Sequence, residues 1–438
     1  MPEAAERKKM GLWMSTSLVV GNMIGAGIFL IPAALAAFGG ISILGWIASA
    51  VGALLIARVF SKLSTIARNK SGGPYTFTQL AFGDFMGFLI AWGYWISVWI
   101  TNAAIAIAFV SAMSVLIPAL GESPVLAVST GLGAIWFLSW VNSRGVRDSG
   151  KMQIVTTLLK IIPILIVILG GFIFFNPDNF VPFNASDEGP FVAVATTATL
   201  TLFAFLGIES ASVPAGDIKD PEKTIPRATM LGTGFVTLIY ILSTIVVMGM
   251  IPMDQLAVSP SPFADAMGII SGGWGRNLVA AGAAISAFGA LNGWILLVGQ
   301  IPMATANDNL FPQFFGRVNK QGVPLRGIII GSLLSSILML MNFSEGLVEQ
   351  FRFMVLLGTF CALVPYLFTA SAYLMLMTKN RPSSKLWWPV ILIGGGAFLY
   401  SIWGLYGAGE SSVFYGFILM MAGIPFYVWI KSRKSKGQ

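Results

Sequence analysis

The stretch V-G-N-M-I-G-A-G-I-F-L-I-P, residues 20–32, lies inside a long apolar segment that covers residues 12–37. It carries Gly21, Gly25 and Gly27 at places where an apolar helix ordinarily has leucine or alanine. Glycine in a helix interior costs about 1 kcal/mol relative to alanine, because its backbone loses more conformational freedom on folding. The sequence therefore predicts a helix that stops and restarts in the middle of this segment.

A break of this kind at membrane depth has a chemical consequence. Lipid cannot satisfy freed amide and carbonyl groups, so non-helical backbone is tolerated there only if it is buried in protein or lines a watery cavity. A half-helix starting near Gly27 would point free N–H groups at that cavity, and carbonyls of residues 21–23 would face it. Such a place suits a carboxylate beside an ammonium group. The same residues also fit a simpler interpretation, in which Gly21 and Gly25 form a small-residue face for close helix packing.

The composition places the chain among polytopic helical membrane proteins. Of its 438 residues, 56% are hydrophobic and 10% are charged, which is too apolar for a soluble globule. The chain has no histidine and one cysteine, Cys361, so it lacks the commonest metal ligand and any disulfide framework. We therefore expect no metal and no cofactor, and a metalloenzyme is disfavoured.

The apolar runs predict an all-α membrane protein with about 12 transmembrane helices. The shortest run, 328–341, would span a bilayer only with its flanking residues. The runs cover residues 12–37, 41–60, 86–117, 125–140, 152–175, 191–211, 229–250, 277–304, 328–341, 351–377, 388–406 and 413–430.

The distribution of charge between these runs predicts the topology. With the N-terminus inside, 23 of the 26 Lys and Arg residues fall on the cytoplasmic side. The opposite loops carry mainly acids, namely Glu122, Asp178, Asp187, Glu188, Asp254, Asp265, Glu345, Glu349 and Glu410. We therefore expect a multi-pass protein of the inner membrane with both termini in the cytoplasm. The net charge of +8 follows from this topology, so no nucleic-acid partner is needed to explain it.

Two ionisable residues lie deep inside predicted spans, Lys160 in the fifth and Glu209 at the end of the sixth. A charge in lipid costs about 3 kcal/mol on insertion scales, so such residues are functional candidates. A structural ion pair, or a residue exposed in a watery vestibule, is the alternative interpretation. The sixth run also contains Gly207, and Ser210 and Ser212 can cap freed backbone near it. Paired glycine-interrupted segments, here at Gly25 and Gly207, are typical of secondary transporters built from inverted repeats.

Six motifs follow one another along the chain. They are G-N-M-I-G-A-G-I-F at residues 21–29, S-G-G-P-Y at 71–75, Y-W-I-S-V-W-I-T-N at 94–102, G-I-E-S-A-S-V-P-A-G-D-I-K-D-P-E-K-T-I-P-R-A at 207–228, G-W-I-L-L-V-G-Q at 293–300 and L-V-P-Y-L at 363–367. In order and spacing this set resembles the amino acid-polyamine-organocation (APC) superfamily, in particular its basic amino acid/polyamine antiporter branch of the arginine/agmatine type.

The resemblance implies a fold and a domain organisation. It implies a transporter that works by alternating access, with a five-plus-five inverted repeat in which helices 1 and 6 are broken. The chain would then divide into a cytoplasmic N-terminus (1–11), a transport core (12–378) with repeats at 12–175 and 191–378, and helices 11 and 12 with a basic tail (379–438).

The resemblance also implies roles for individual residues. The substrate carboxylate and amine would be held by backbone at Met23, Gly25, Ala26 and Gly27, with the amine site completed by carbonyls near Phe203 and Leu206. The substrate side chain would be flanked by Trp294, and its far end would lie among Ser97, Val98, Asn102, Ile105 and Gly358. A gating network would be formed by Tyr94, Glu209 and Tyr366. An indole such as Trp294 can hold a cation by cation-π attraction, or simply pack against an apolar side chain.

Some residues depart from the arginine/agmatine pattern. That antiporter has hydrogen-bonding side chains where this chain has Ala26, Phe203 and Gly358, which puts arginine as substrate in doubt. Other members of the superfamily carry a lysine at the position of Lys160, where its ammonium group stands in for a sodium ion and bridges helix 5 to the break in helix 1. Lys160 would then either release a proton during the cycle or serve only as a strut.

These observations leave two transport hypotheses and one from another class. The first is an amino acid exchanger or proton-coupled permease, and the alternative is an antiporter of a cationic amino acid for its decarboxylated amine. A channel or membrane enzyme is disfavoured, because the sequence has no repeated filter motif, no metal-ligand cluster and no nucleophile–base arrangement. The expected partners are an amino acid or amine and the lipid bilayer, with protons and a second copy of the chain as further candidates.

Overall fold

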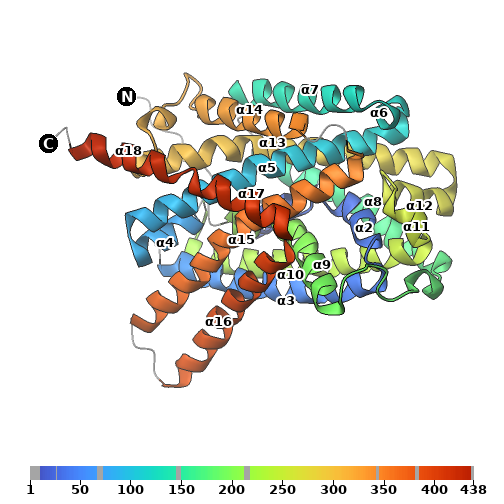
Figure 1. The fold of residues 1–438 in the computed structure, drawn as a ribbon, viewed down its shortest axis with the longest axis horizontal. Coiled ribbons are helices and arrows are strands. Elements are labelled where there is room, and N and C mark those ends of the chain that lie inside the picture. Colours follow the sequence, from blue (N-terminus) through green and yellow to red (C-terminus); the bar gives the residue numbers. More distant parts are fainter. Residues whose placement is uncertain are drawn as a thin grey trace.

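The computed structural model of the chain consists almost entirely of helices (Figure 1). It describes residues 10–25, 27–66, 73–144, 149–211, 218–341, 345–379 and 384–435. Within these ranges the only extended pairing is one isolated bridge between Met10 and Ile218. The predicted all-α class is therefore confirmed.

Eighteen α-helices occur in the described part of the chain. They are α1 (Leu12–Met23), α2 (Gly27–Ala36), α3 (Ser42–Ile66), α4 (Pro74–Phe82), α5 (Asp84–Leu116), α6 (Ala119–Glu122), α7 (Pro124–Ser143), α8 (Ser149–Gly171), α9 (Pro190–Leu202), α10 (Pro221–Met250), α11 (Met253–Ala257), α12 (Pro262–Ser271), α13 (Gly273–Asn307), α14 (Leu325–Met341), α15 (Leu347–Lys379), α16 (Ser384–Gly407), α17 (Glu410–Met421) and α18 (Ile424–Ser435).

Nine helical segments among the described residues are long and apolar enough to cross a membrane. The pair α1 and α2 passes the same test together, with a bend of 40° between the two helices. Two shorter apolar helices, Lys160–Phe174 and Leu325–Met341, coincide with the predicted fifth and ninth runs. The chain is therefore a multi-pass membrane protein, while the count of twelve spans stays a prediction.

The long helix α5 lies near the middle of the molecule, where α13 and α15 pack against it (Figure 1). A second group forms around α3, which packs against α9 and α10. Trp46 of α3 is fully buried there, and its ring lies 6.0 Å from Phe205 and 5.6 Å from Tyr240 between centroids. Small residues permit this packing, since a Cβ at Gly45 would overlap the side chain of Thr197 on α9.

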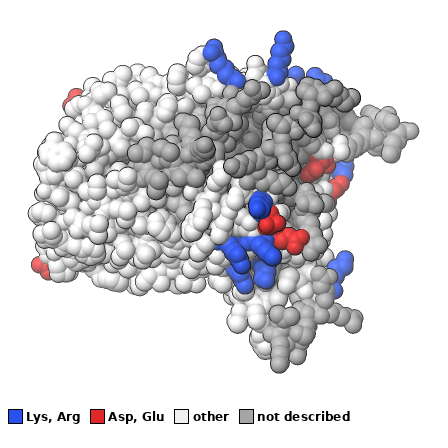
Figure 2. Space-filling view, turned by 180° about the vertical axis from the view of Figure 1, so that it is seen from behind, with Lys and Arg blue, Asp and Glu red and all other residues white. Residues whose placement is uncertain are grey.

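Charged side chains are concentrated toward one end of the molecule (Figure 2). Helix α18, the last helix of the described chain, lies toward that same end in the ribbon view (Figure 1). Most of the remaining visible surface is uncharged, as expected for the part of a protein that faces lipid.

Candidate functional site

The first helix is broken within the stretch 20–32, as predicted. Helix α1 ends at Met23, and Ile24 leaves helical geometry with ψ of 79°. The amide of Gly25 then donates a hydrogen bond to the Met23 carbonyl at 2.8 Å, and α2 begins at Gly27. The predicted half-helix start at Gly27 is therefore confirmed. Ala26, another predicted substrate-binding residue, lies outside the described residues.

Two side chains from other helices satisfy carbonyl groups at the end of α1. The Lys160 ammonium group of α8 donates to the Gly21 carbonyl at 3.1 Å, and Lys160 is only 5% exposed. The Tyr240 hydroxyl of α10 donates to the Met23 carbonyl at 2.6 Å. A helix end leaves carbonyls without intrahelical partners, so these two donors stabilise the break. Lys160 thus connects helix α8 to the break, as the resemblance implied.

The sixth run is also discontinuous. Helix α9 ends at Leu202 and is followed by a 3-10 turn at Phe203–Phe205, after which Leu206 is extended with ψ of 133°. Gly207 has φ of +106°, a conformation that residues with a Cβ rarely adopt. A second 3-10 turn, Ile208–Ala211, carries Glu209. Ser212, which we expected to cap freed backbone, lies outside the described residues.

The two breaks lie against each other. A Cβ placed on Gly207 would lie 3.3 Å from the backbone carbonyl carbon of Asn22, near the end of α1. A Cβ on Gly27 would lie 3.1 Å from the ring of Phe203. The ring of Phe203 in turn meets Phe351 of α15 edge to face, with 6.0 Å between centroids. Glycine at positions 27 and 207 therefore allows the two interrupted helices to approach closely.

Glu209 connects the second break to two long helices. It is 1% exposed, and its carboxylate accepts hydrogen bonds from the Tyr94 hydroxyl of α5 and, at 2.8 Å, from the Tyr366 hydroxyl of α15. Two phenol donors directed at one carboxyl group suit an ionised, acceptor-only carboxylate. The structure thus brings together the three residues that the resemblance grouped as a gate.

Several buried polar groups on α5 and α15 have no hydrogen-bond partner in the part of the chain that the structure describes. Asn102 is fully buried, and neither its amide nitrogen nor its amide oxygen has a hydrogen-bond partner among the described residues. The hydroxyl groups of Thr101 and Thr359 are likewise unpaired in that part of the chain. Gly358 brings the two helices together there, since a Cβ on it would lie 3.6 Å from the Thr101 hydroxyl. An unpaired buried polar group costs about 1–3 kcal/mol, so this region is suited to a polar ligand.

The remaining predicted residues are buried on α5, on α13 and at the second break. Ser97 uses its hydroxyl to bond the Tyr94 carbonyl at 2.7 Å, so it is less available to a ligand than Asn102. Val98 and Ile105 follow Tyr94 on roughly the same side of α5, at helical spacing. Trp294 is 6% exposed on α13, and Leu206 is 4% exposed at the second break.

Sequence reasoning missed two residues at the first break. Tyr240 donates a hydrogen bond to the Met23 carbonyl. A Cβ placed on Gly25 would lie 3.4 Å from the side chain of Ala290 on α13. Trp294 is four residues after Ala290, so it lies one turn further along the same face of α13. The single tyrosine in the apolar run 229–250 was the only signal for Tyr240, and a buried alanine gives none.

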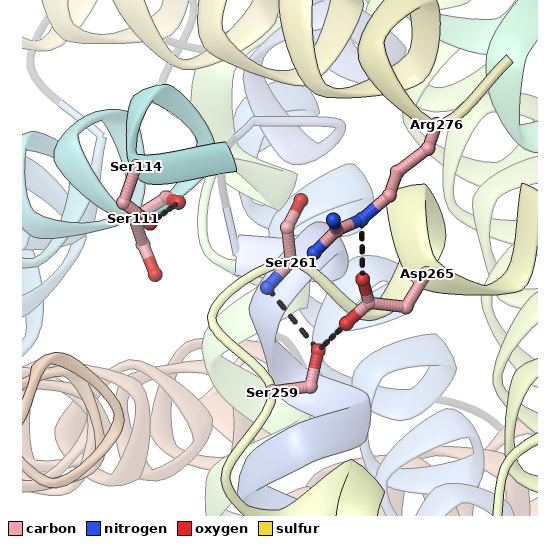
Figure 3. Close-up of polar contacts among 6 residues, drawn as sticks. All are labelled: Ser111, Ser114, Ser259, Ser261, Asp265 and Arg276. Atoms are coloured by element: carbon pink, nitrogen blue, oxygen red, sulfur yellow. Dashed lines mark hydrogen bonds and ion pairs between the residues drawn. The ribbon is translucent and has the colours of Figure 1, made fainter. Parts of the chain in front are cut away.

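A polar cluster joins elements at the ends of α5, α12 and α13 (Figure 3). Ser111 of α5 donates to the Pro260 carbonyl at 2.6 Å, while Arg276 of α13 pairs with Asp265 of α12 at 2.9 Å. Asp265 also accepts a hydrogen bond from Ser259. The loop before α12 is thereby attached to both long helices. Arg276 and Asp265 are each partly exposed, in keeping with their predicted place outside the membrane.

The chain was compared with known proteins. A model of the amino acid permease family matches residues 10–430. The chain belongs to this family. The cadaverine/lysine antiporter of Escherichia coli (strain K12) is 37% identical over 338 residues, which are 76% of this chain and 75% of that protein. The putrescine transporter PotE is 33% identical in the same strain and 31% identical in Haemophilus influenzae, over 98% of both chains in each case.

These matches confirm the resemblance to the basic amino acid/polyamine antiporters of the APC superfamily. This amino acid permease is a secondary transporter, as the paired helix breaks indicated. Its relatives are named for transport of diamines and of lysine, which bears on the choice between the two transport hypotheses.

Proposed function

We propose that this permease exchanges a cationic amino acid for the diamine formed by its decarboxylation. The observation that carries the proposal is the unpaired amide of Asn102, buried on the helix that also bonds Glu209 beside the second break. An aliphatic amino acid has polar groups at one end only and would leave Asn102 unsatisfied. A lysine- or ornithine-like substrate has a polar group at each end. The names of the relatives favour the same choice.

The two ends of such a substrate would bind different parts of the site. At the α-carbon end, free N–H groups at the start of α2 suit the carboxylate, and carbonyls near Phe203 and Leu206 suit the ammonium group. Asn102 lies eight residues after Tyr94, which is about 12 Å along α5. Trp294 would cover the alkyl chain or the distal ammonium group. Met23, Gly25, Ala26, Val98, Ile105 and Gly358 would complete the wall.

One site can serve both partners of the exchange. A diamine differs from its parent amino acid only by the missing carboxylate, so the ammonium groups can occupy the same places. Exchange then needs no second substrate site, only alternation of one site between the two sides. Glu209 with Tyr94 and Tyr366 would close one side of it.

Lys160 has a positioning role in this proposal. Its bond to the Gly21 carbonyl holds the first break in the geometry that binds substrate. Coupling to protons through Lys160 is the alternative role, and the two predict different responses to pH.

The proposed orientation has both termini in the cytoplasm of a bacterial inner membrane, following the excess of Lys and Arg on that side. For the domains we keep the division that the resemblance implies, with a transport core of two repeats at 12–378 and a C-terminal part at 379–438.

Counterflow in proteoliposomes tests the exchange. Vesicles containing the full chain are loaded with unlabelled lysine, ornithine, arginine, cadaverine, putrescine or alanine, and uptake of external labelled lysine or ornithine is followed. We expect transient accumulation with an internal cationic amino acid or its diamine, and none with alanine. Accumulation driven by internal alanine would show the broader exchanger instead. Uptake driven only by a proton gradient would show a permease.

A further inference from the structure

A cavity of about 280 Å³ opens between the first turns of α15 and the segment that joins α16 to α17. Figure 1 labels these helices. Its volume is near the lower limit for ligand sites in proteins, which suits a molecule the size of an amino acid. None of the residues assigned to the central site lines it.

Three charged side chains line this outer cavity, Glu349, Arg352 and Glu410. The Arg352 guanidinium lies 3.8 Å from the Glu349 carboxylate and over the ring of Phe38, 5.1 Å from its centroid. Glu410 forms no ion pair with any described residue. Two carboxylates and one guanidinium give the cavity a net charge of −1.

A hydroxyl on the cavity wall also lacks a protein partner among the described residues. Ser412 is 3% exposed and lines the cavity, and its hydroxyl has no hydrogen bond to any residue that the structure describes. Its oxygen is not among the unpaired polar atoms that are shielded from solvent, so it is accessible and can bond a ligand in the cavity. This observation is independent of the charges.

The cavity shares its helices with the central site. Arg352 follows Phe351, whose ring meets the Phe203 ring that covers Gly27. Arg352 also lies over Phe38, two residues beyond the end of α2. From Arg352 to Gly358 is about 9 Å along α15. A ligand in the cavity is therefore adjacent to the elements that form the first helix break.

We infer that the outer cavity is a second binding site for a cationic amino acid, occupied before the substrate reaches the helix breaks. Arg352 receives the carboxylate, Glu349 and Glu410 receive the two ammonium groups, and Ser412 bonds the carboxylate. The charges balance, since the site carries −1 and the ligand +1. The diamine has no carboxylate for Arg352, so it binds more weakly. The class of ligand rests on the proposed function, whereas the cavity and its charges do not.

Transport kinetics at each membrane face give the first test. Labelled lysine is presented to right-side-out or everted membrane vesicles containing wild-type protein, Glu410→Gln or Arg352→Gln. We expect KM to rise about fivefold at the face that carries the cavity, the factor for one partly exposed ion pair, with kcat unchanged. The control Glu345→Gln removes an acid that does not line the cavity and leaves KM unchanged. Equal KM values in all proteins, or equal increases at both faces, overturn the inference.

Binding without transport gives the second test. In Gly27→Val the added methyl groups meet the Phe203 ring and block the central site. Saturation-transfer NMR on this full-length variant is recorded with lysine, cadaverine and alanine as probes, after size-exclusion chromatography shows a folded protein. We expect lysine to bind better than cadaverine, alanine to bind weakly, and Arg352→Gln to abolish the preference for lysine. No lysine signal, or an unchanged preference in Arg352→Gln, overturns the inference. Because this readout needs no turnover, it stands even if counterflow shows another exchange reaction.

Discussion

Gly207 lies against Asn22, so that the two interrupted helices of this permease meet at a glycine with a left-handed backbone. A Cβ on Gly207 would lie 3.3 Å from the Asn22 carbonyl carbon, and the φ of Gly207 is +106°. Both the space and the conformation thus require glycine at this position. The contact places the two helix breaks side by side.

Gly207→Ala tests this contact. The left-handed conformation costs an alanine about 1–2 kcal/mol, and the methyl group must displace the α1 backbone as well. We expect the exchange rate to fall at least tenfold and the melting temperature to drop. Gly234→Ala on α10 is the matched control, because nothing lies within 4 Å of its Cβ, and it should be neutral or slightly stabilising. Wild-type exchange by Gly207→Ala would contradict a close contact between the breaks.

Tyr366→Phe tests the contacts of Glu209. The substitution removes one of two phenol donors from a buried carboxylate, and a hydrogen bond to a charged group is worth about 1.5–3 kcal/mol. We expect thermal unfolding at a lower temperature and slower exchange, with Glu209→Gln more severe because both tyrosines lose the charge they bond. Tyr406→Phe, at a 57% exposed tyrosine, is the control and should change neither property. If Tyr366→Phe behaves like this control, the network does not take part in gating.

Lys160→Ala separates a proton carrier from a strut. We expect the variant to lose transport, and to change its dependence on pH, more than it loses substrate binding, measured by isothermal titration calorimetry. The reason is that Lys160 bonds the Gly21 carbonyl and is not among the residues proposed to contact the substrate. A pH dependence identical to wild type would eliminate the proton role and leave the strut.

Trp294→Leu tests how the distal end is held. Leucine keeps an apolar surface but removes the aromatic face, and a cation-π contact is worth about 0.5–2 kcal/mol. We expect the Kd for lysine and cadaverine to rise several-fold more than that for an aliphatic amino acid. Equal losses for both classes would mean that Trp294 serves only as packing.

Tyr75→Phe tests a contact near the ends of α4 and α13. The Tyr75 hydroxyl donates to the Asp308 carboxylate at 3.0 Å, and burial, together with the Asp308 charge, raises the pKa of Tyr75 well above its usual value. Because the pKa is raised in the folded state, the contribution of Tyr75 to the free energy of unfolding is complete below about pH 10, the usual pKa of tyrosine. It is lost as pH rises further. We expect Tyr75→Phe to lower the free energy of unfolding by about 1 kcal/mol at pH 7. The difference from wild type should shrink above pH 10, and a constant difference would contradict the assignment.

The sequence was sufficient to predict features that depend on local chemistry. Glycine at positions 25, 27 and 207 weakens a helix whatever its tertiary contacts, so both breaks could be placed within a few residues. Lys160 and Glu209 were identifiable because charge inside an apolar run is costly. The excess of Lys and Arg on alternate loops also indicates a topology, which stays a prediction.

Other features depend on helices distant in sequence, and periodicity does not determine these contacts. The bond from Tyr240 to the Met23 carbonyl and the approach of Ala290 to Gly25 exist only because α10 and α13 pack against α1. Residue type could not predict that Asn102 has no partner among the described residues while Ser97 bonds its own helix. The outer cavity joins Arg352 to a segment almost sixty residues later in the chain.

We propose that one site binds both a two-ended cationic substrate and its diamine. The most direct measurement is competition binding to the purified full-length protein and its Asn102→Leu variant, with labelled lysine or ornithine displaced by cadaverine, putrescine or alanine. We expect the corresponding diamine to displace the label completely in wild type and alanine to do so poorly. Asn102→Leu should weaken the binding of lysine and diamine together while sparing that of alanine. Displacement by alanine as effective as that by the diamine, with no selective effect of Asn102→Leu, would contradict the proposal.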